Sequence, residues 1–87
     1  MKSFCESEFW EQYEKLPSKI QDLADSKFAL WTNDPNHASL EFKKVKGKPD
    51  WWSVRIGLTY RALCIRIDDK CNWFFIGSHA DYDSLMP

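Results

Sequence analysis

The chain has 87 residues, which is enough for one small domain, 1–87, and too short for a second. Its hydrophobic fraction is 44 % and its charged fraction is 29 %, as in ordinary globular proteins, so we do not expect a disordered chain. No apolar run approaches the roughly 20 residues of a membrane-spanning helix, and no signal-peptide pattern is present. We therefore expect a cytoplasmic protein that does not enter a membrane.

Charge is distributed unevenly along the chain. The net charge is −1, but residues 35–67 hold seven Lys and Arg against only two acidic residues. The segments 1–34 and 68–87 are both acidic. A cationic middle segment between acidic ends is consistent with an anionic partner, or with a set of solvated lysines on a loop.

The cysteines and histidines do not show the spacing of a structural zinc site. Zinc ligands in such sites come in close pairs, whereas Cys5, Cys64 and Cys71 are well separated in the sequence. His37 and His79 are also far apart. An odd number of cysteines fits free thiols in a reducing compartment, and we expect no metal.

Helical signals occupy the first third of the chain. Ser3 and Glu6 have the spacing of a capping box, and apolar residues then follow every three or four positions. Pro17 interrupts this pattern and also suits the first turn of a second helix. We predict two helices, over residues 4–15 and 17–32, that form a hairpin.

After residue 36 the apolar pattern changes to a period of two, which is typical of β-strands, and we expect strands around 40–43, 52–56 and 62–67. Residues 72–77 are nearly all apolar, which suits a fourth, central strand, and short turns separate the strands. The prediction is an α+β domain. In it, the N-terminal helix hairpin packs on one face of a small, mainly antiparallel four-stranded sheet, and a short C-terminal tail follows.

The second face of this sheet is the expected place for a functional site. If Val54 and Ile56 face the helices, Arg55 faces away from them. Arg61 lies in an apolar run, where an unpaired cation is costly, so it should pair with a carboxylate or reach an anion. Which side Arg61 takes relative to Arg55 depends on the register of the two strands, which the sequence leaves open.

Several short motifs resemble, in their order and spacing, the RelE/ParE superfamily of toxins from type II toxin–antitoxin modules. The similarity covers residues of about 8 to 85. It rests on these segments: Leu16-Pro17 with Ile20-Gln21, Asn33-Asp34-Pro35, Leu40 with Lys44-Val45-Lys46-Gly47, Ser53-Val54-Arg55-Ile56, Tyr60-Arg61-Ala62-Leu63, and Ile76-Gly77-Ser78-His79 with Tyr82.

This resemblance implies a metal-independent endoribonuclease without a cofactor that cleaves mRNA on the ribosome and inhibits translation. Arg61 matches the phosphate-binding arginine of the family, and Arg55 matches a catalytic basic position. His79 lies where several members carry a C-terminal Arg or His, although it could equally be a structural imidazole. Tyr82 matches a tyrosine that stacks on a base or orients the substrate.

Another basic residue of the family would fall at Ser53, and here the serine departs from the pattern. That departure keeps a second function open, a ParE-type toxin that poisons a protein target such as DNA gyrase without cutting RNA. A third alternative is a catalytically degenerate homologue that acts only as an interaction module.

Binding residues for nucleic acid are expected in the cationic segment, where lysines can hold phosphates. The candidates are Lys43, Lys44, Lys46 and Lys48. One of the adjacent Trp51 and Trp52 must face outward, and Trp52 is our candidate for stacking on a base. The resemblance also implies a cognate antitoxin as protein partner, which would cover apolar surface and the cationic site.

Overall fold

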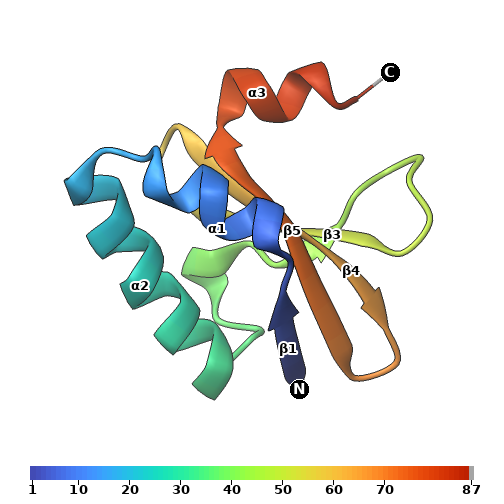
Figure 1. The fold of residues 1–87 in the computed structure, drawn as a ribbon. Coiled ribbons are helices and arrows are strands. Elements are labelled where there is room, and N and C mark those ends of the chain that lie inside the picture. Colours follow the sequence, from blue (N-terminus) through green and yellow to red (C-terminus); the bar gives the residue numbers. More distant parts are fainter. Residues whose placement is uncertain (87) are drawn as a thin grey trace.

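The computed structural model describes residues 1–86 (Figure 1). The elements in chain order are β1 (Lys2–Cys5), α1 (Ser7–Glu14), α2 (Ser18–Asn33), a 3₁₀ turn η1 (Ala38–Leu40), β2 (Lys43–Lys44), β3 (Trp51–Ile56), β4 (Tyr60–Ile67), β5 (Lys70–Ser78) and α3 (His79–Ser84). None of the helices in this part of the chain has the length and apolar character that crossing a bilayer requires.

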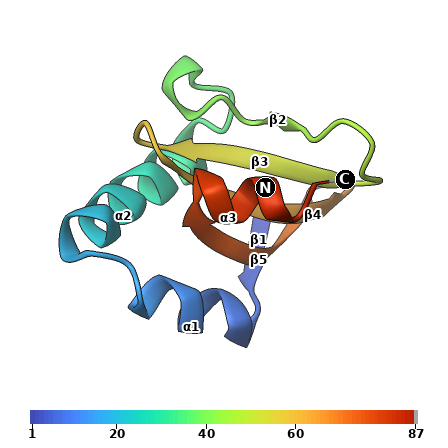
Figure 2. The same cartoon turned by 90° about the horizontal axis from the view of Figure 1, so that it is seen from above.

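The strands form one sheet in the order β1-β5-β4-β3-β2. Strands β2 to β5 pair antiparallel, and β1 pairs parallel with β5. Helix α1 packs on β5 and α2 on β3, while α3 lies beside the end of β5 that leads into it (Figure 2). The predicted helix hairpin on a mainly antiparallel sheet is confirmed, with five strands in place of four.

The additional strand overlaps the start of the predicted first helix, 4–15. Residues 2–5 are extended, and α1 begins at Ser7 without a side-chain cap from Glu6. The backbone N–H of Lys2 donates to the carbonyl of Asp69, and that of Glu6 donates to the carbonyl of Trp73. The predicted capping box was wrong because pairing with β5, 68 residues later in the chain, satisfies these backbone groups instead.

The predicted strand over 40–43 is also shorter and later than expected. Leu40 ends η1 with its side chain fully buried, and Glu41 follows with a left-handed φ of 45°. Only Lys43 and Lys44 pair with β3. At the other end of the chain, the tail after Ser78 forms α3, whose N-terminus is capped by the Ser78 hydroxyl accepting from the Asp81 N–H.

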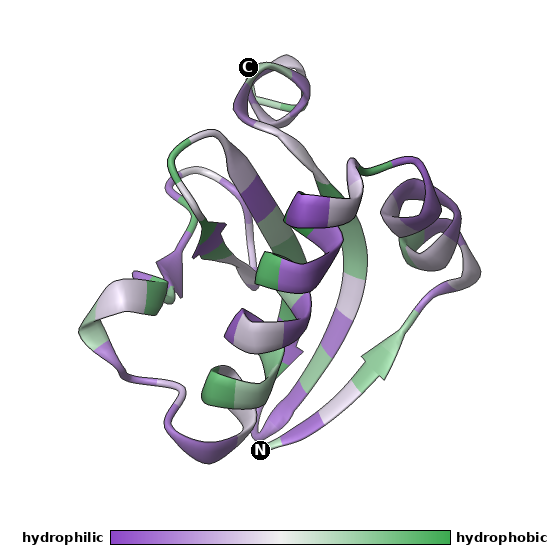
Figure 3. Ribbon diagram, turned by 90° about the vertical axis from the view of Figure 1, so that its left-hand side faces the viewer, coloured by the Kyte–Doolittle hydropathy of each residue, from purple (hydrophilic) through white to green (hydrophobic). Residues whose placement is uncertain are grey.

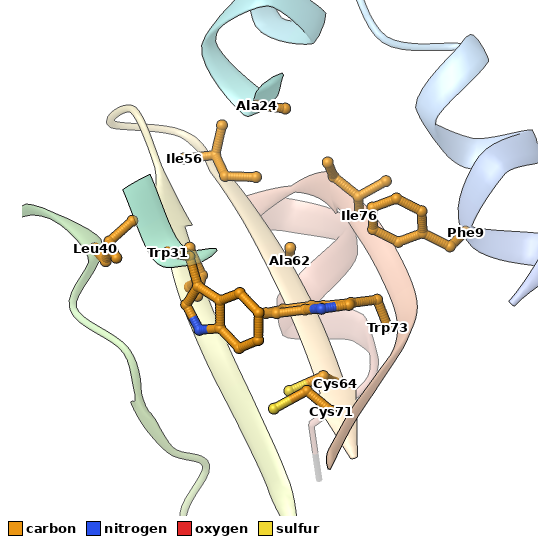
Figure 4. Packing of buried hydrophobic residues seen from close by; sticks show 11 residues of the cluster. Phe9, Ala24, Trp31, Leu40, Ile56, Ala62, Cys64, Cys71, Trp73 and Ile76 are labelled. Carbon is orange, nitrogen blue, oxygen red and sulfur yellow. The ribbon is translucent and has the colours of Figure 1, made fainter. Parts of the chain in front are cut away.

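Aromatic rings fill the space between the helices and the sheet (Figure 4). Trp73 of β5 packs edge to face against Phe28 at 5.0 Å and against Trp31 at 5.3 Å between ring centroids. Phe9 of α1 contacts Phe28 in the same way. Figure 3 shows that hydrophobic and hydrophilic residues alternate along the helices and strands, as expected for elements that bury one face. This core leaves the opposite face of the sheet without a covering helix.

Candidate active site

The register of β3 and β4 answers the question that the sequence left open. Arg55 is directly opposite Arg61, and Arg61 is opposite Gly77 of β5. The neighbouring pair, Val54 and Ala62, is buried against the helices. Since side chains alternate along a strand, Arg55 and Arg61 both lie on the face that the helices leave open.

Arg55 is held in place by two acceptors. Its Nη1 donates to Glu41 Oε2 at 2.6 Å, and its Nε donates to the carbonyl of Gly57 at 2.9 Å. Lys43 Nζ lies 3.8 Å from the other carboxylate oxygen of Glu41. The hydrogen bond from Arg55 is the main cause that lowers the pKa of Glu41, so this carboxylate is ionised at neutral pH.

Arg61 lacks such a partner. Within residues 1–86 its Nη1 is buried and makes no hydrogen bond, and no carboxylate lies at ion-pair distance. The salt bridge that was one of the two expectations for Arg61 is therefore not formed in this part of the chain. A guanidinium with an unused N–H beside a second guanidinium favours an anion between or above them.

His79 and Tyr82 lie together in α3. The centroids of their rings are 5.7 Å apart, and His79 Nδ1 is 3.1 Å from Asp83 Oδ2. The N–H of His79 donates to the carbonyl of Thr59, in the turn between β3 and β4. This places the start of α3 beside the turn that links Arg55 to Arg61, although no hydrogen bond or ion pair within residues 1–86 joins either ring to these arginines.

The lysines follow β2 and the loop that connects it to β3. Lys43 is directly opposite Ser53, and Lys44 is opposite Trp52. Lys48 Nζ lies 5.0 Å from the ring centroid of Trp51. The segment 43–48 therefore carries its charge along one edge of the sheet, with Lys43 on the face of the two arginines and Lys44, opposite Trp52, on the helix-covered face.

The two adjacent tryptophans face opposite sides, as expected, but Trp51 is the one that shares a face with Arg55. Trp51 packs against Phe74 at 4.8 Å on the open face. Trp52 packs against Phe42 at 5.0 Å on the helix-covered face, with the guanidinium of Arg66 4.4 Å from its ring centroid. The predicted binding residue Trp52 thus lies across the sheet from the two arginines.

Glu41 was not among the residues chosen from the sequence. It precedes β2, and only its left-handed backbone turn brings its carboxylate to Arg55, 14 residues later in the chain. In the sequence, Glu41 is simply a polar residue between the apolar Leu40 and Phe42, and nothing there indicates a contact with Arg55. The register of Arg55 and Arg61, by contrast, follows from the three-residue loop between Ile56 and Tyr60.

No three His, Cys, Asp or Glu side chains gather into a possible metal site within residues 1–86. The open face instead presents two guanidinium groups, one ionised carboxylate and an ammonium group. Such a set can bind an anion such as a phosphodiester and stabilise added negative charge on it. Ser53 is two residues before Arg55 on the same face of β3, and it is buried and carries no positive charge. Lys43 is directly opposite Ser53 on β2 and brings an ammonium group to that face.

A family model described as ParE-like toxin domain matches residues 18–84. The chain belongs to the ParE-like toxin family. No curated protein sequence matches this toxin domain. Solved structures share its fold at low identity. A chain of the RelB–RelE antitoxin–toxin complex from Methanococcus jannaschii is 16 % identical with a TM-score of 0.78, over 97 % of this chain and 99 % of that one.

Two further structures agree with this comparison. YafQ from E. coli strain BL21(DE3) is 10 % identical with a TM-score of 0.75, over 99 % of this toxin domain and 98 % of that chain. A chain of the intact E. coli RelBE toxin–antitoxin complex is 18 % identical with a TM-score of 0.67, over 87 % of this chain and 93 % of that one. The resemblance to RelE/ParE toxins is thereby confirmed for the family and the fold.

Proposed function

We propose that this toxin domain is a metal-independent endoribonuclease that cleaves mRNA on the ribosome. The observation that carries the proposal is the pair Arg55 and Arg61, directly opposite each other on the open face of the sheet. Arg61 is partly exposed, and its buried Nη1 has no hydrogen-bond partner within residues 1–86, so no internal carboxylate neutralises this guanidinium at short range. Two guanidinium groups suit a phosphodiester because they remain charged and match its oxygens in pairs.

The proposed reaction is attack of a ribose 2′-OH on the adjacent phosphorus. The 2′-O–P bond forms, the P–O5′ bond breaks, one base takes the 2′-OH proton, and one acid returns a proton to the 5′-oxygen. Arg55 and Arg61 stabilise the charge that develops on the phosphorane. His79 and Tyr82 beside it are the proposed proton-transfer and positioning groups.

Glu41 has a positioning role in this scheme. Its oxygens are already engaged by Arg55 and Lys43. The lowered pKa also makes it a weak base, because general-base catalysis works best with a pKa near the operating pH. The carboxylate instead holds the guanidinium of Arg55 in the orientation that faces Arg61.

The cationic edge formed by residues 43–48 would hold the RNA backbone as it enters the site. Lys44 and Lys46 are exposed and form no ion pair within residues 1–86, so they can neutralise phosphates. Trp51 lies on the face with Arg55 and is a candidate for stacking on a base. Lys43, opposite Ser53, would supply the cation that the serine lacks.

A cognate antitoxin is the proposed protein partner. Structural relatives were crystallised as antitoxin–toxin complexes. In this chain Phe4, Trp10 and Ile67 are large apolar residues that are each at least half exposed, and such residues dominate the energetics of interfaces. An antitoxin that covers them and the arginine pair would keep the toxin inactive.

Expression without antitoxin tests the proposed activity. Primer extension on mRNA after induction should show new 5′ ends for wild type, and R61A should lose them together with growth arrest. Arg66 lies in the same strand but contacts Trp52 on the helix-covered face, so R66A is the matched control and should still cleave. Cleavage by R61A at the wild-type level would refute the assignment.

A second candidate function is poisoning of a protein target such as DNA gyrase. The match to the ParE-like family model and the serine at position 53 favour it. This function predicts a DNA-damage response after induction, no mRNA cleavage, and full toxicity of H79A. The same induced cultures distinguish the two functions.

A further inference from the structure

Three sulfur atoms from separate parts of the chain lie close together on the helix-covered face of the sheet, at the end near the N-terminus. The thiol of Cys71 in β5 donates to Met1 Sδ at 3.2 Å. The thiol of Cys64 in β4 lies beside that of Cys71 (Figure 4). Cys64 and Cys71 are both fully buried and free of disulfide bonds.

This sulfur cluster (Met1, Cys64 and Cys71) is separate from the site around the arginine pair. Cys64 and Ala62 share the buried face, whereas Arg61 points to the other side. The third cysteine, Cys5, is outside the cluster because Trp73 stands between it and Cys64 in the sheet.

We propose that Met1, Cys64 and Cys71 form a binding site for a soft monovalent metal ion, Cu(I). Two thiolates and one thioether are the soft donors that Cu(I) prefers. A structural zinc ion would need four ligands in a tetrahedron, and the cluster offers three. His, Asp and Glu side chains do not join it within residues 1–86.

The binding step exchanges protons for the metal ion. Binding replaces the two S–H protons, which leave to the solvent, and involves no electron transfer. The complex of one Cu(I) with two thiolates carries one negative charge, and Arg66, directly opposite Cys71, offsets it.

Met1 provides the entrance to the cluster. It is 45 % exposed and precedes β1, which forms one edge of the sheet. An ion can reach Cys71 when the Met1 side chain moves aside and then returns as a ligand. Bound metal would link the start of β1 to β4 and β5, so it should raise the melting temperature.

Anaerobic titration of the full chain with Cu(I), in competition with a chelating dye, tests the proposal. Wild type should bind one equivalent, and C71A should bind at least about 100-fold more weakly, beyond the effect of outer-shell changes. C5A removes a thiol outside the cluster and is the matched control, with affinity like wild type. Equal losses in C5A and C71A, or no binding by wild type, would overturn the site.

A spectroscopic measurement keeps the test independent of folding in the variants. X-ray absorption at the copper edge of wild type should show a shell of three sulfur donors. A shell of nitrogen and oxygen donors would show surface binding and contradict the proposal. Neither experiment depends on ribonuclease activity, so the two proposals can fail separately.

Discussion

Arg55 and Arg61 face each other across β3 and β4, with Arg55 bound to Glu41 and Arg61 bound to no side chain within residues 1–86. Like charges directly opposite each other destabilise a sheet. Glu41 is hydrogen-bonded to Arg55 alone and acts on Arg61 only through its charge, so two guanidinium groups share one carboxylate and favour an additional anion. This arrangement explains why the site should bind a phosphate and why it costs stability.

The first prediction is a trade between stability and function at position 61. R61M keeps most of the apolar stem and removes the charge with its unpartnered N–H, so it should raise the free energy of unfolding by about 1 kcal/mol and abolish cleavage. R66M should instead lower it by about 0.5–1 kcal/mol, because Arg66 contacts Trp52 through a cation–π interaction. Urea denaturation measures both. A loss of stability in R61M as large as in R66M would contradict this account.

The second prediction concerns pH and Glu41. Because Arg55 lowers the pKa of Glu41 in the folded protein, the ion pair adds stability above the ordinary pKa of an unfolded glutamate. That stability is lost as the pH falls through the lowered value. Wild type should therefore be more stable than E41Q at pH 7, and the difference should begin to shrink near the ordinary glutamate pKa of about 4.3 and disappear only below the lowered pKa. Denaturation curves of both proteins from pH 7 to acid measure it, and a difference independent of pH would exclude the ion pair.

The third prediction separates the two histidines. H79A should reduce the rate of mRNA cleavage by about 10²–10⁴-fold, as expected for a proton-transfer group, and should flatten the dependence of the rate on pH. His37 only accepts a hydrogen bond from the Ser39 N–H in η1, so H37A should cleave as wild type does. Single-turnover rates between pH 5.5 and 8.5 provide the measurement. An unchanged pH profile in H79A would remove His79 from the proton transfer.

The fourth prediction concerns the cationic edge. K44E/K46E should weaken binding to single-stranded RNA and reduce the slope of log affinity against log salt by about 1.4, since each lost phosphate contact removes about 0.7. Lys15 and Lys19 lie outside the open face, near α1 and at the start of α2. The double variant K15E/K19E is the control of equal charge change. If both double variants lose the same slope, the contribution is net charge alone and the edge is not the RNA path.

The fifth prediction uses two glycines with positive φ. Gly47 has φ +80° with nothing near an added Cβ, so G47A should cost about 1–2 kcal/mol from the backbone alone. Gly57 has φ +65°, and an added Cβ would lie 2.9 Å from Leu23 Cδ2 of α2, so G57A should cost more. The carbonyl of Gly57 also orients Arg55, and cleavage should fall in G57A. Thermal unfolding of both variants tests the order of the two costs.

The sequence predicted the elements that depend on local pattern. Helix α2 begins and ends within one residue of the predicted 17–32, because an apolar stripe and two prolines define it. Strands β3 and β4 follow from alternation and turn residues, and β5 from a nearly continuous apolar run. The resemblance was carried by the order of short motifs, which survives the 10–18 % identity of the structural comparisons reported above.

What the sequence did not predict depends on contacts between distant residues. Residues 2–5 form a strand only because β5 is there to pair with them. Glu41 enters the site through one left-handed residue, and Trp51 is distinguished from Trp52 only by which face of β3 meets the helices. The sulfur cluster combines three segments that no spacing rule connects.

The most direct test of the central claim is cleavage of a defined mRNA on programmed ribosomes by the purified toxin domain, without added metal beyond what the ribosome needs. Wild type and R66A should produce fragments ending in a 2′,3′-cyclic phosphate, and R61A should produce none. Intact mRNA with wild type, or equal cleavage by wild type and R61A, would contradict the claim that the opposed pair Arg55 and Arg61 is the catalytic anion site.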